Sequence, residues 1–371
     1  MGNVSDAKYK KLLAQLKADI LNGKYASGQR FPSVRALAQK SGIARSTIAH
    51  AMDELCRLGF VSRRQGCGTI VTSRGASRKI GLIVPGLAYS EFYLPFLSAI
   101  NRMATENGYV LLLGEVYSND PRMRVNQVRQ LANRFLAEGV AGVVYQPFEL
   151  LSESRSVNRS VLSVFEARRI PVVLVASDIV PSPERSAYDV VGINDFEAGR
   201  RLALHLRDVG VRRLAFFLNE YSNYSVQNRL VGLRSVFVEK PTVRSVLSDS
   251  PDEKSLRRLL SGRNSPDAIV CRSDAVAARV MATLRKIGKE VPKDVLVAGF
   301  NDIGYAATLD ITSVKVPSAD IARFAFRSLM ARMSDPSLMP HEQVLPAPLT
   351  VRGSTTRIRR RMSPARKGGV S

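Results

Sequence analysis

The sequence predicts an α/β protein in which two lobes, each a parallel sheet with helices on both faces, follow a small helical domain. The main observation is that continuous apolar runs alternate with helical segments from residue 80 onward, which is typical of strands buried on both faces. The 277 residues from 80 to 356 are more than one open sheet of this kind needs, so they predict two lobes. The third observation is helix, short turn, helix spacing before residue 73.

The composition is that of a folded protein and argues against several classes. Of the 371 residues, 45% are hydrophobic and 23% are charged, so the chain can bury a core, unlike a disordered polycation. No apolar run reaches the roughly 18–20 residues that span a bilayer, and MGNVSDAKYKKLL lacks the apolar region of a signal peptide, so we expect no membrane association. Three cysteines without a CxxC pair and three histidines fit a reducing cytoplasm and predict neither a metal site nor a cofactor.

The net charge of +23 is distributed unevenly along the chain. Residues 1–79 hold 15 Lys and Arg against four acidic residues, and residues 357–371 hold six basic residues and no acidic one. A basic N-terminal domain beside a nearly neutral body is typical of a protein that binds a polyanion through that domain. The alternative is a basic surface that is merely solvated.

The N-terminal domain, residues 1–73 and called the head below, is expected to form three helices. Ser33 can cap the second, over 34–40, and the SGIA turn leads into the third, over 45–59. In a helix-turn-helix the last helix enters the major groove with its first residues facing the bases. An arginine can bond a guanine edge with two hydrogen bonds, and hydroxyls can reach a base or a phosphate. The residues at that position are Arg45, Ser46 and Thr47.

The segment FVSRRQGCGTIVT after the third helix predicts a β-hairpin, or wing. Two β-prone runs flank a glycine-containing tip, and Arg63 and Arg64 would lie on its first strand. Gly66 and Gly68 would let the backbone approach a sugar–phosphate chain closely. Isolated arginines are often only solvated, so the interpretation depends on the whole ordered set.

The head resembles the winged helix-turn-helix of the gluconate-repressor (GntR) family over nearly its whole length. The matching features are the "G…G…PS.R.LA" entry, the "R-S-T" helix start, the "L…G" helix end and the "RRQG.GT" wing. The resemblance implies DNA contacts through Arg35, the start of the third helix and the wing tip at Gly66, with Ser33 in the same PSxR segment. Ala44, Ala49 and His50 depart from the family pattern, which implies a different base preference.

The body is expected at 80–356, after a polar linker at 74–79 and before a basic disordered tail at 357–371. We expect strands at the runs KIGLIVP, YVLLLG, GVVYQP, PVVLVA, VVGI, RLAFFL, DAIVC, DVLVAGF and ITSVKV. Ligands of such folds bind beyond the carboxyl ends of the strands, here in a cleft between the lobes. The tail can add non-specific phosphate contacts or be only solvated.

The body resembles the lactose-repressor (LacI/GalR) regulatory domain, itself similar to periplasmic sugar-binding proteins. The resemblance rests on KIGLIVP, RLVGLRSVF, the long segment from SPDAIVC to GFNDI, and LTVRGST. It implies two Rossmann-like lobes of the type I periplasmic-binding-protein kind, a homodimer and a small effector. Lobe one is expected at about 80–177 and 307–335, and lobe two at about 178–306 and 336–356.

The resemblance also implies which residues hold the effector. Arg229 matches the family's ligand-gripping arginine, whereas Asn301, Ser273 and Ala176 stand where Asp, Asn and Asp are usual. An Asn still donates and accepts hydrogen bonds but loses the charge-assisted part. Aromatic faces for a sugar ring are expected from Phe92, Tyr93 and Tyr224. Asp274 completes the expected set, with two alternatives left open: Asp274 is only a helix N-cap, and Phe92 or Tyr93 belongs to the core.

These features predict a cytoplasmic transcriptional regulator, a repressor, that binds double-stranded operator DNA under the control of a small effector, a sugar. Other interpretations are a body that only dimerises the head and a binding protein for a non-sugar effector. An enzyme is not expected, because the sequence has no pyridoxal-lysine context, G-x-S-x-G, P-loop or zinc-spaced triad. A transport-type solute-binding protein is disfavoured by the basic head and the absence of a signal peptide.

Overall fold

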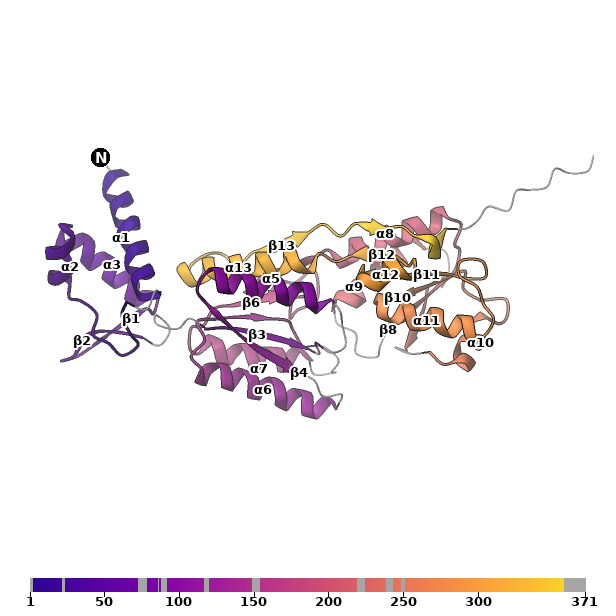
Figure 1. Ribbon diagram of the computed structural model, residues 1–371, viewed down its shortest axis with the longest axis horizontal. Helices are drawn as coiled ribbons and strands as arrows, with labels where there is room; N and C mark the ends of the chain where they lie inside the picture. Colours follow the sequence, from indigo (N-terminus) through magenta and orange to yellow (C-terminus); the bar gives the residue numbers. More distant parts are fainter. Residues whose placement is uncertain are drawn as a thin grey trace, which may run out of the picture. The chain divides into compact units, whose positions relative to one another are not determined.

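The structure is a computed structural model that describes residues 3–21, 24–72, 79–85, 87, 92–116, 120–148, 154–218, 224–237, 243–247 and 251–356. Contacts divide the chain into two compact units. One consists of Met1–Ile193 and Pro317–Leu345, and the other of Asn194–Val316 and Pro346–Ser371. The first unit contains the head and lobe one, and the second contains lobe two (Figure 1).

The head is a three-helix domain with a hairpin, as expected. Its elements are α1 (Asn3–Leu21), α2 (Val34–Ser41), α3 (Arg45–Arg57), β1 (Val61–Arg64) and β2 (Gly68–Val71). The apolar residues at helical spacing form one small core with the hairpin, in which Ile20, Ile48 and Leu55 are completely buried. Since the helices share this core, they hold the turn between α2 and α3 and the base of the hairpin in place.

Lobe one is a six-stranded sheet in the order β13-β7-β6-β5-β3-β4, and each neighbouring pair is parallel. Figure 1 shows α6 and α7 on one side of this sheet and α5 and α13 on the other. The strands are β3 (Lys79–Pro85), β4 (Val110–Val116), β5 (Gly142–Tyr145), β6 (Val172–Val175), β7 (Asp189–Ile193) and β13 (Glu342–Leu345). The helices are α5 (Tyr93–Glu106), α6 (Pro121–Ala137), α7 (Ser154–Glu166) and α13 (Ser318–Ser334).

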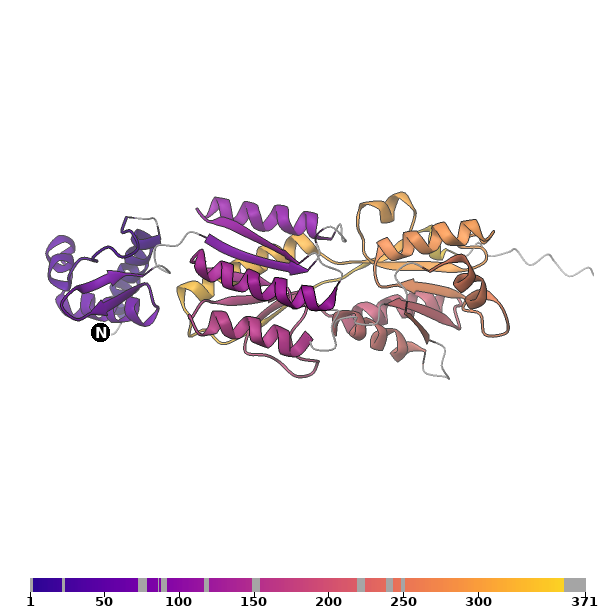
Figure 2. The same ribbon diagram turned by 90° about the horizontal axis from the view of Figure 1, so that it is seen from below.

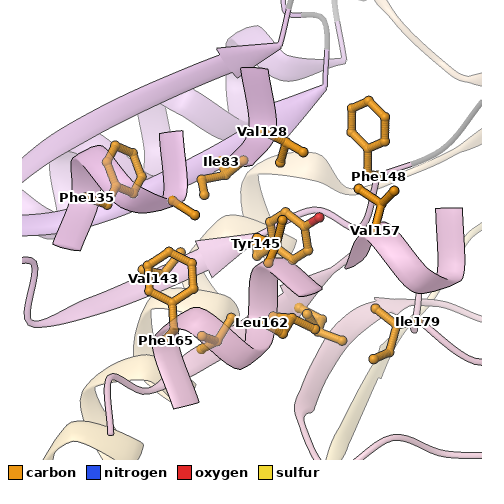
Figure 3. Packing of buried hydrophobic residues seen from close by; sticks show 14 of the residues in the cluster. Ile83, Val128, Phe135, Val143, Tyr145, Phe148, Val157, Leu162, Phe165 and Ile179 are labelled. Atoms are coloured by element: carbon orange, nitrogen blue, oxygen red, sulfur yellow. The ribbon is translucent and has the colours of Figure 1, made fainter. Parts of the chain in front are cut away.

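The core of lobe one on the α6 and α7 side packs valine and aromatic side chains against the sheet (Figure 3). Tyr145 is completely buried there, and its hydroxyl donates to the side-chain oxygen of Asn158 on α7. The same oxygen accepts the backbone N–H of Phe148 at 2.6 Å, and the Asn158 amide donates to the Phe148 carbonyl at 2.9 Å. A buried polar side chain is tolerated when its bonds are satisfied, and here it holds the loop after β5 at the carboxyl edge of the sheet.

Lobe two has a second six-stranded sheet, in the order β14-β12-β11-β10-β8-β9, parallel except for β14. Figure 2 shows the rose α8 and α9 on one side of the strands and the orange α11 on the other. The strands are β8 (Leu214–Leu218), β9 (Val243–Leu247), β10 (Ala268–Cys271), β11 (Leu296–Asn301), β12 (Thr312–Lys315) and β14 (Leu349–Thr350). The helices are α8 (Asp195–Asp208), α9 (Tyr224–Val236), α10 (Glu253–Leu260), α11 (Asp274–Lys286), α12 (Gly304–Thr308) and the 3-10 turn η2 (Gly353–Thr355).

The predicted α/β class with two parallel-sheet lobes is therefore confirmed, but the expected changes between lobes lie too early in the chain. The units change after Ile193, Val316 and Leu345, not near 177, 306 and 335. The reason is strand pairing, because β7 pairs with β6 and β13 pairs with β7, which keeps both in lobe one, whereas β12 pairs with β11 in lobe two. Three edge strands, β9, β13 and β14, were not predicted, since edge strands need no continuous apolar run.

Two expected segments lie largely outside the described residues. The expected linker at 74–79 falls there except for Lys79, which already begins β3. The expected basic tail at 357–371 falls there entirely.

Candidate DNA-binding surface and effector site

The first turn of α3 presents the side chains expected to read DNA. Arg45 and Ser46 are exposed and Thr47 is partly buried, while Ile48 and Met52 on the same helix are buried in the head. Ala44 at the N-cap makes no side-chain hydrogen bond, which agrees with its departure from the family pattern. The first turn of α3 is therefore polar and exposed, while the opposite face of the helix packs on the core of the head.

The PSxR segment begins α2, and the expected cap is confirmed. The Ser33 hydroxyl accepts the backbone N–H of Ala36 at 3.2 Å. Arg35 in the first turn is exposed. Gly42 ends the helix at φ +68° and donates to the Ala38 carbonyl at 2.9 Å, so the turn before α3 is a tight left-handed cap.

The wing is an antiparallel pair of β1 and β2 in which Arg63 faces Thr69 and Arg64 faces Gly68. Gly66 and Gly68 have φ of +77° and +82°, which only glycine adopts without strain. Arg63 is exposed and forms an ion pair with Asp53 of α3, so its charge is partly balanced within the head. For Arg64 the structure describes the backbone, and its side chain lies outside the described part.

Arg229 lies at the carboxyl end of the lobe-two sheet and is 8% exposed. Its Nε donates to the Asp195 carboxylate at 2.7 Å, and its Nη1 donates to the Arg272 carbonyl, just after β10, at 3.2 Å. Its guanidinium carbon lies 4.6 Å from the centre of the Phe300 ring of β11. Burial raises the pKa of Asp195, and the charge of Arg229 offsets part of this effect.

Close packing of α8 against α9 brings Asp195 and Arg229 together. A Cβ at Gly199 of α8 would lie 2.2 Å from the Arg229 carbonyl oxygen, and one at Gly232 of α9 would lie 2.0 Å from that of Phe196. Both positions therefore require glycine because the helices approach too closely for a Cβ, and not because of a positive φ. The sequence shows Asn194-Asp195 as an inversion of the usual Asp-Asn but does not predict that Asp195 pairs with Arg229, because no local pattern links residues 34 positions apart.

Asp274 is completely buried and anchors the ends of three lobe-two elements. Its carboxylate accepts the Ser313 hydroxyl of β12 at 2.7 Å and the Ile303 backbone N–H at 3.1 Å. Burial raises the pKa of Asp274 to about 7, although these hydrogen bonds lower it in part. The N-cap of α11 is Ser273, whose hydroxyl accepts the Val276 N–H at 3.4 Å, so the alternative in which Asp274 is the N-cap is wrong.

Asn301 ends β11 at φ +103° and is partly exposed, next to the Arg229 and Asp274 positions along the same sheet edge. Asparagine tolerates positive φ better than most residues with a side chain. Tyr224, the first residue of α9, is also partly exposed. Lobe two thus gathers Arg229, Ser273 and Asn301 at the carboxyl ends of β10 and β11.

The two aromatic candidates of lobe one differ in exposure. Tyr93 begins α5 and is 6% exposed, which favours the core alternative, and Phe92 before it is partly exposed. Their rings make an edge contact with centroids 5.3 Å apart. Phe148 and Arg124 of the same lobe were missed, with the guanidinium 5.0 Å from the ring centre. Phe148 belongs to the polar and aromatic run QPF directly after a buried strand, whereas no such pattern marks Arg124.

Two further observations concern metals and membranes. Within the described ranges, no group of three His, Cys, Asp or Glu side chains could hold a metal ion. None of the helices in the part of the chain that the structure describes combines the length and apolar composition that a membrane crossing requires.

Two protein-family models match the chain. The model for bacterial regulatory proteins of the gntR family matches residues 8–71, which are the three helices and the wing. The model for the periplasmic binding protein-like domain matches residues 203–355.

The chain is similar over almost its full length to proteins named as regulators. It is 23% identical to the arabinose metabolism transcriptional repressor of Geobacillus stearothermophilus over 368 residues, which are 95% of this chain and 98% of that protein. It is 27% identical to the HTH-type transcriptional regulator reg1 of Streptomyces lividans over 337 residues, 86% of this chain and 91% of that protein.

Solved structures share the fold of the body. The transcription regulator GntR of Chromobacterium violaceum matches with a TM-score of 0.61 at 23% identity, over 75% of this chain and 99% of that chain. A LacI family regulator of Enterococcus faecalis with bound ribose matches with a TM-score of 0.62 at 21% identity, over 74% and 98%. A complex of the transcriptional regulator CelR with cellobiose matches with a TM-score of 0.63 at 20% identity, over 87% and 100%.

The winged head, the parallel-sheet lobes and the named relatives agree. The chain is a transcriptional regulator in which residues 8–71 match the gntR family of bacterial regulatory proteins and residues 203–355 match the periplasmic binding protein-like domain.

Proposed function

We propose that the chain is a cytoplasmic repressor that binds double-stranded operator DNA as a homodimer. The carrying observation is the exposed opening of α3 at Arg45 and Ser46, beside a glycine-tipped hairpin and within the segment that matches the gntR family. A two-fold dimer would place two such helices on two half-sites separated by turns of the duplex. Base readout is assigned to Arg45, Ser46 and Thr47, and backbone contacts to Ser33, Arg35, Arg63, Arg64, Gly66 and Gly68.

We propose further that a sugar bound at the carboxyl ends of the strands controls operator binding. Arg229 supports this, because a guanidinium held by Asp195 and by a backbone carbonyl keeps further N–H donors in a fixed orientation for hydroxyl groups. Arabinose, ribose and cellobiose in the names of similar proteins point to the same class of ligand. Phe92, Tyr224, Ser273 and Asn301 complete the proposed set, whereas the burial of Tyr93 and Asp274 limits these two to a supporting role behind the site.

The sugar would control operator binding through its different affinities for two arrangements of the lobes. A ligand that binds one arrangement of the lobes more tightly shifts the population toward it, and the spacing of the two heads changes with that population. An effector that is not a sugar is the second candidate. The observation that favours it is the loss of acidic side chains where the family usually has them, at Ala176 and Asn301.

The first prediction concerns Arg45→Ala, which tests the proposed role of α3 in reading DNA. The variant should bind its operator about 10- to 100-fold more weakly while binding unrelated duplex almost normally, because one bidentate base contact is worth about 1–3 kcal/mol. A gel-shift series with a duplex selected by the full chain from a random-sequence library measures this. Unchanged sequence preference would contradict the assignment of α3 as the reading helix.

The second prediction concerns the replacement of Arg229, which tests the proposed effector site. Since Arg229→Ala leaves Asp195 buried and unpaired, the sharper variant combines Arg229→Met with Asp195→Asn, which removes both charges. It should bind operator DNA normally and lose the response to the sugar that a thermal-shift screen of mono- and oligosaccharides identifies. Calorimetry that gives equal affinity of the variant and the original chain for this sugar would refute the site.

A further inference from the structure

Arg30 lies on a third extended segment beside the wing. The Phe31 N–H donates to the Thr69 carbonyl at 2.7 Å, and Arg30 forms an antiparallel bridge with Ile70. Phe31 is 2% exposed and packs edge-on against Tyr25, so this segment ties the hairpin to the head core. Because side chains alternate along extended backbone, Arg30 points the opposite way from Phe31, and it is exposed.

The guanidinium of Arg30 lies over Gly68, at the base of the wing tip. A Cβ at Gly68 would be 3.2 Å from the Arg30 Nε and 3.3 Å from its Nη2. Gly68 faces Arg64 across the hairpin, and the tip with Gly66 lies between them. Gly68 is therefore required for two reasons: its φ of +82°, and the space that the Arg30 side chain occupies.

Some cations of the head are paired with acids and some of its arginines are not. Arg57, Arg63 and Lys24 are each paired with an acid of the head, namely Glu54, Asp53 and Asp19. Within the described side chains, Arg30, Arg35 and Arg45 form no ion pair. A cation already paired with a carboxylate gains less from a phosphate, whereas an unpaired exposed cation gains the full interaction and releases a DNA counterion. Arg30 thus shares the electrostatic state of Arg35 and Arg45, two of the four arginines assigned to DNA, whereas Arg63, a third, is paired with Asp53.

We propose that Arg30 is a further DNA-binding residue, which holds a backbone phosphate beside the wing. Its planar fork suits a phosphate, and its place over Gly68 keeps it next to the hairpin expected to approach the sugar–phosphate chain. Arg30 positions the head on the duplex and does not read bases. The inference rests on the proposed DNA-binding function and adds a contact outside the helix-turn-helix and the wing strands.

The test uses the full chain, fluorescence anisotropy, the duplex selected from a random-sequence library, and an unrelated duplex of equal length. Arg30→Ala should weaken binding to both duplexes by a similar factor, about tenfold per head, since a hydrogen bond to a charged group is involved. The slope of log affinity against log salt should fall by about one per head. Arg30→Lys, which keeps the charge, should restore most of the salt slope.

The matched control is Arg57→Ala, which removes an arginine already paired with Glu54 and should change neither affinity nor salt slope. If Arg30→Ala binds both duplexes with the affinity and salt slope of the original chain while Arg45→Ala loses discrimination, the Arg30 proposal is wrong and the DNA-binding proposal stands. A loss confined to the selected duplex would also overturn it, because that is the signature of base readout. If the original chain binds no duplex, the proposed function itself fails.

Discussion

At the scale of single residues, lobe two contains two buried acids whose carboxylates are stabilised by different partners. Asp195 keeps a full ion pair with Arg229, whereas Asp274 has hydroxyl and amide donors and no arginine or lysine partner among the described residues. A buried carboxylate without an opposite charge favours its protonated form, so the pKa of Asp274 rises to about 7. Its Oδ1 approaches Gly299 so closely that a Cβ at this position would lie 2.2 Å from it, so the position requires glycine.

Because of this raised pKa, Asp274 makes the free energy of unfolding depend on pH. Between the ordinary aspartate pKa of 3.8 and about 7, the folded chain binds a proton that the unfolded chain has already lost. This contribution to stability is therefore present below about pH 4 and is lost as the pH rises to about 7. Asp274→Asn should gain stability relative to the original chain over this window, by up to about 4 kcal/mol. Urea unfolding across about pH 4–8 measures the gain.

The control is Asp208→Asn, which makes the same substitution at a carboxylate that is 69% exposed. A constant difference between Asp274→Asn and the original chain at every pH would mean that the carboxyl group titrates normally. Asparagine can keep both bonds, accepting from Ile303 and donating to the Ser313 hydroxyl, so loss of folding is not expected.

At the scale of elements, the position of Arg229, the proposed effector-binding arginine, depends on how closely α8 and α9 approach. The two glycines at the crossing leave carbonyl oxygens of the partner helix at 2.2 and 2.0 Å from where a Cβ would be. Backbone cannot move aside as a flexible side chain can, so a methyl group must separate the helices. Separation would lengthen the contact between Asp195 and Arg229, which lie on the two helices.

Gly199→Ala should therefore lower the free energy of unfolding by about 1–3 kcal/mol and weaken effector binding. Gly304→Ala is the control, because nothing lies within 4 Å of its Cβ position and its φ is not positive. Thermal unfolding and calorimetry with the identified sugar measure both effects. Equal stability and sugar affinity in Gly199→Ala and the original chain would show that the helix crossing does not position Arg229.

At the scale of the whole molecule, the +23 charge belongs to parts with different roles. The basic excess of residues 1–79 accompanies a DNA-binding domain, and the body carries little net charge for its length. A regulator that couples the two parts obeys linkage: the factor by which the sugar changes operator affinity equals the factor by which the operator changes sugar affinity.

Sugar affinity measured by calorimetry should consequently change when the selected operator duplex is present, by the same factor that the sugar changes operator affinity in anisotropy. A factor of about 5–150 is typical of such coupling. An unrelated duplex serves as the control and should change it less. If the operator leaves sugar affinity unchanged and the sugar leaves operator affinity unchanged, the sugar site and the DNA-binding head are not coupled.

The sequence alone determined the α/β class, the winged head and the cap at Ser33, because these depend on local periodicity, turn residues and short motifs. It also selected Arg45 and Arg229 as candidates through ordered motifs. Only the tertiary structure decided where the chain passes between units, that Asp195 holds Arg229, that Asp274 is an anchor and not a cap, and that Arg30 covers Gly68. The reason is physical: strand pairing at edges, charge pairing in the interior and side chains that share space join residues far apart in sequence, and no local pattern records such distances.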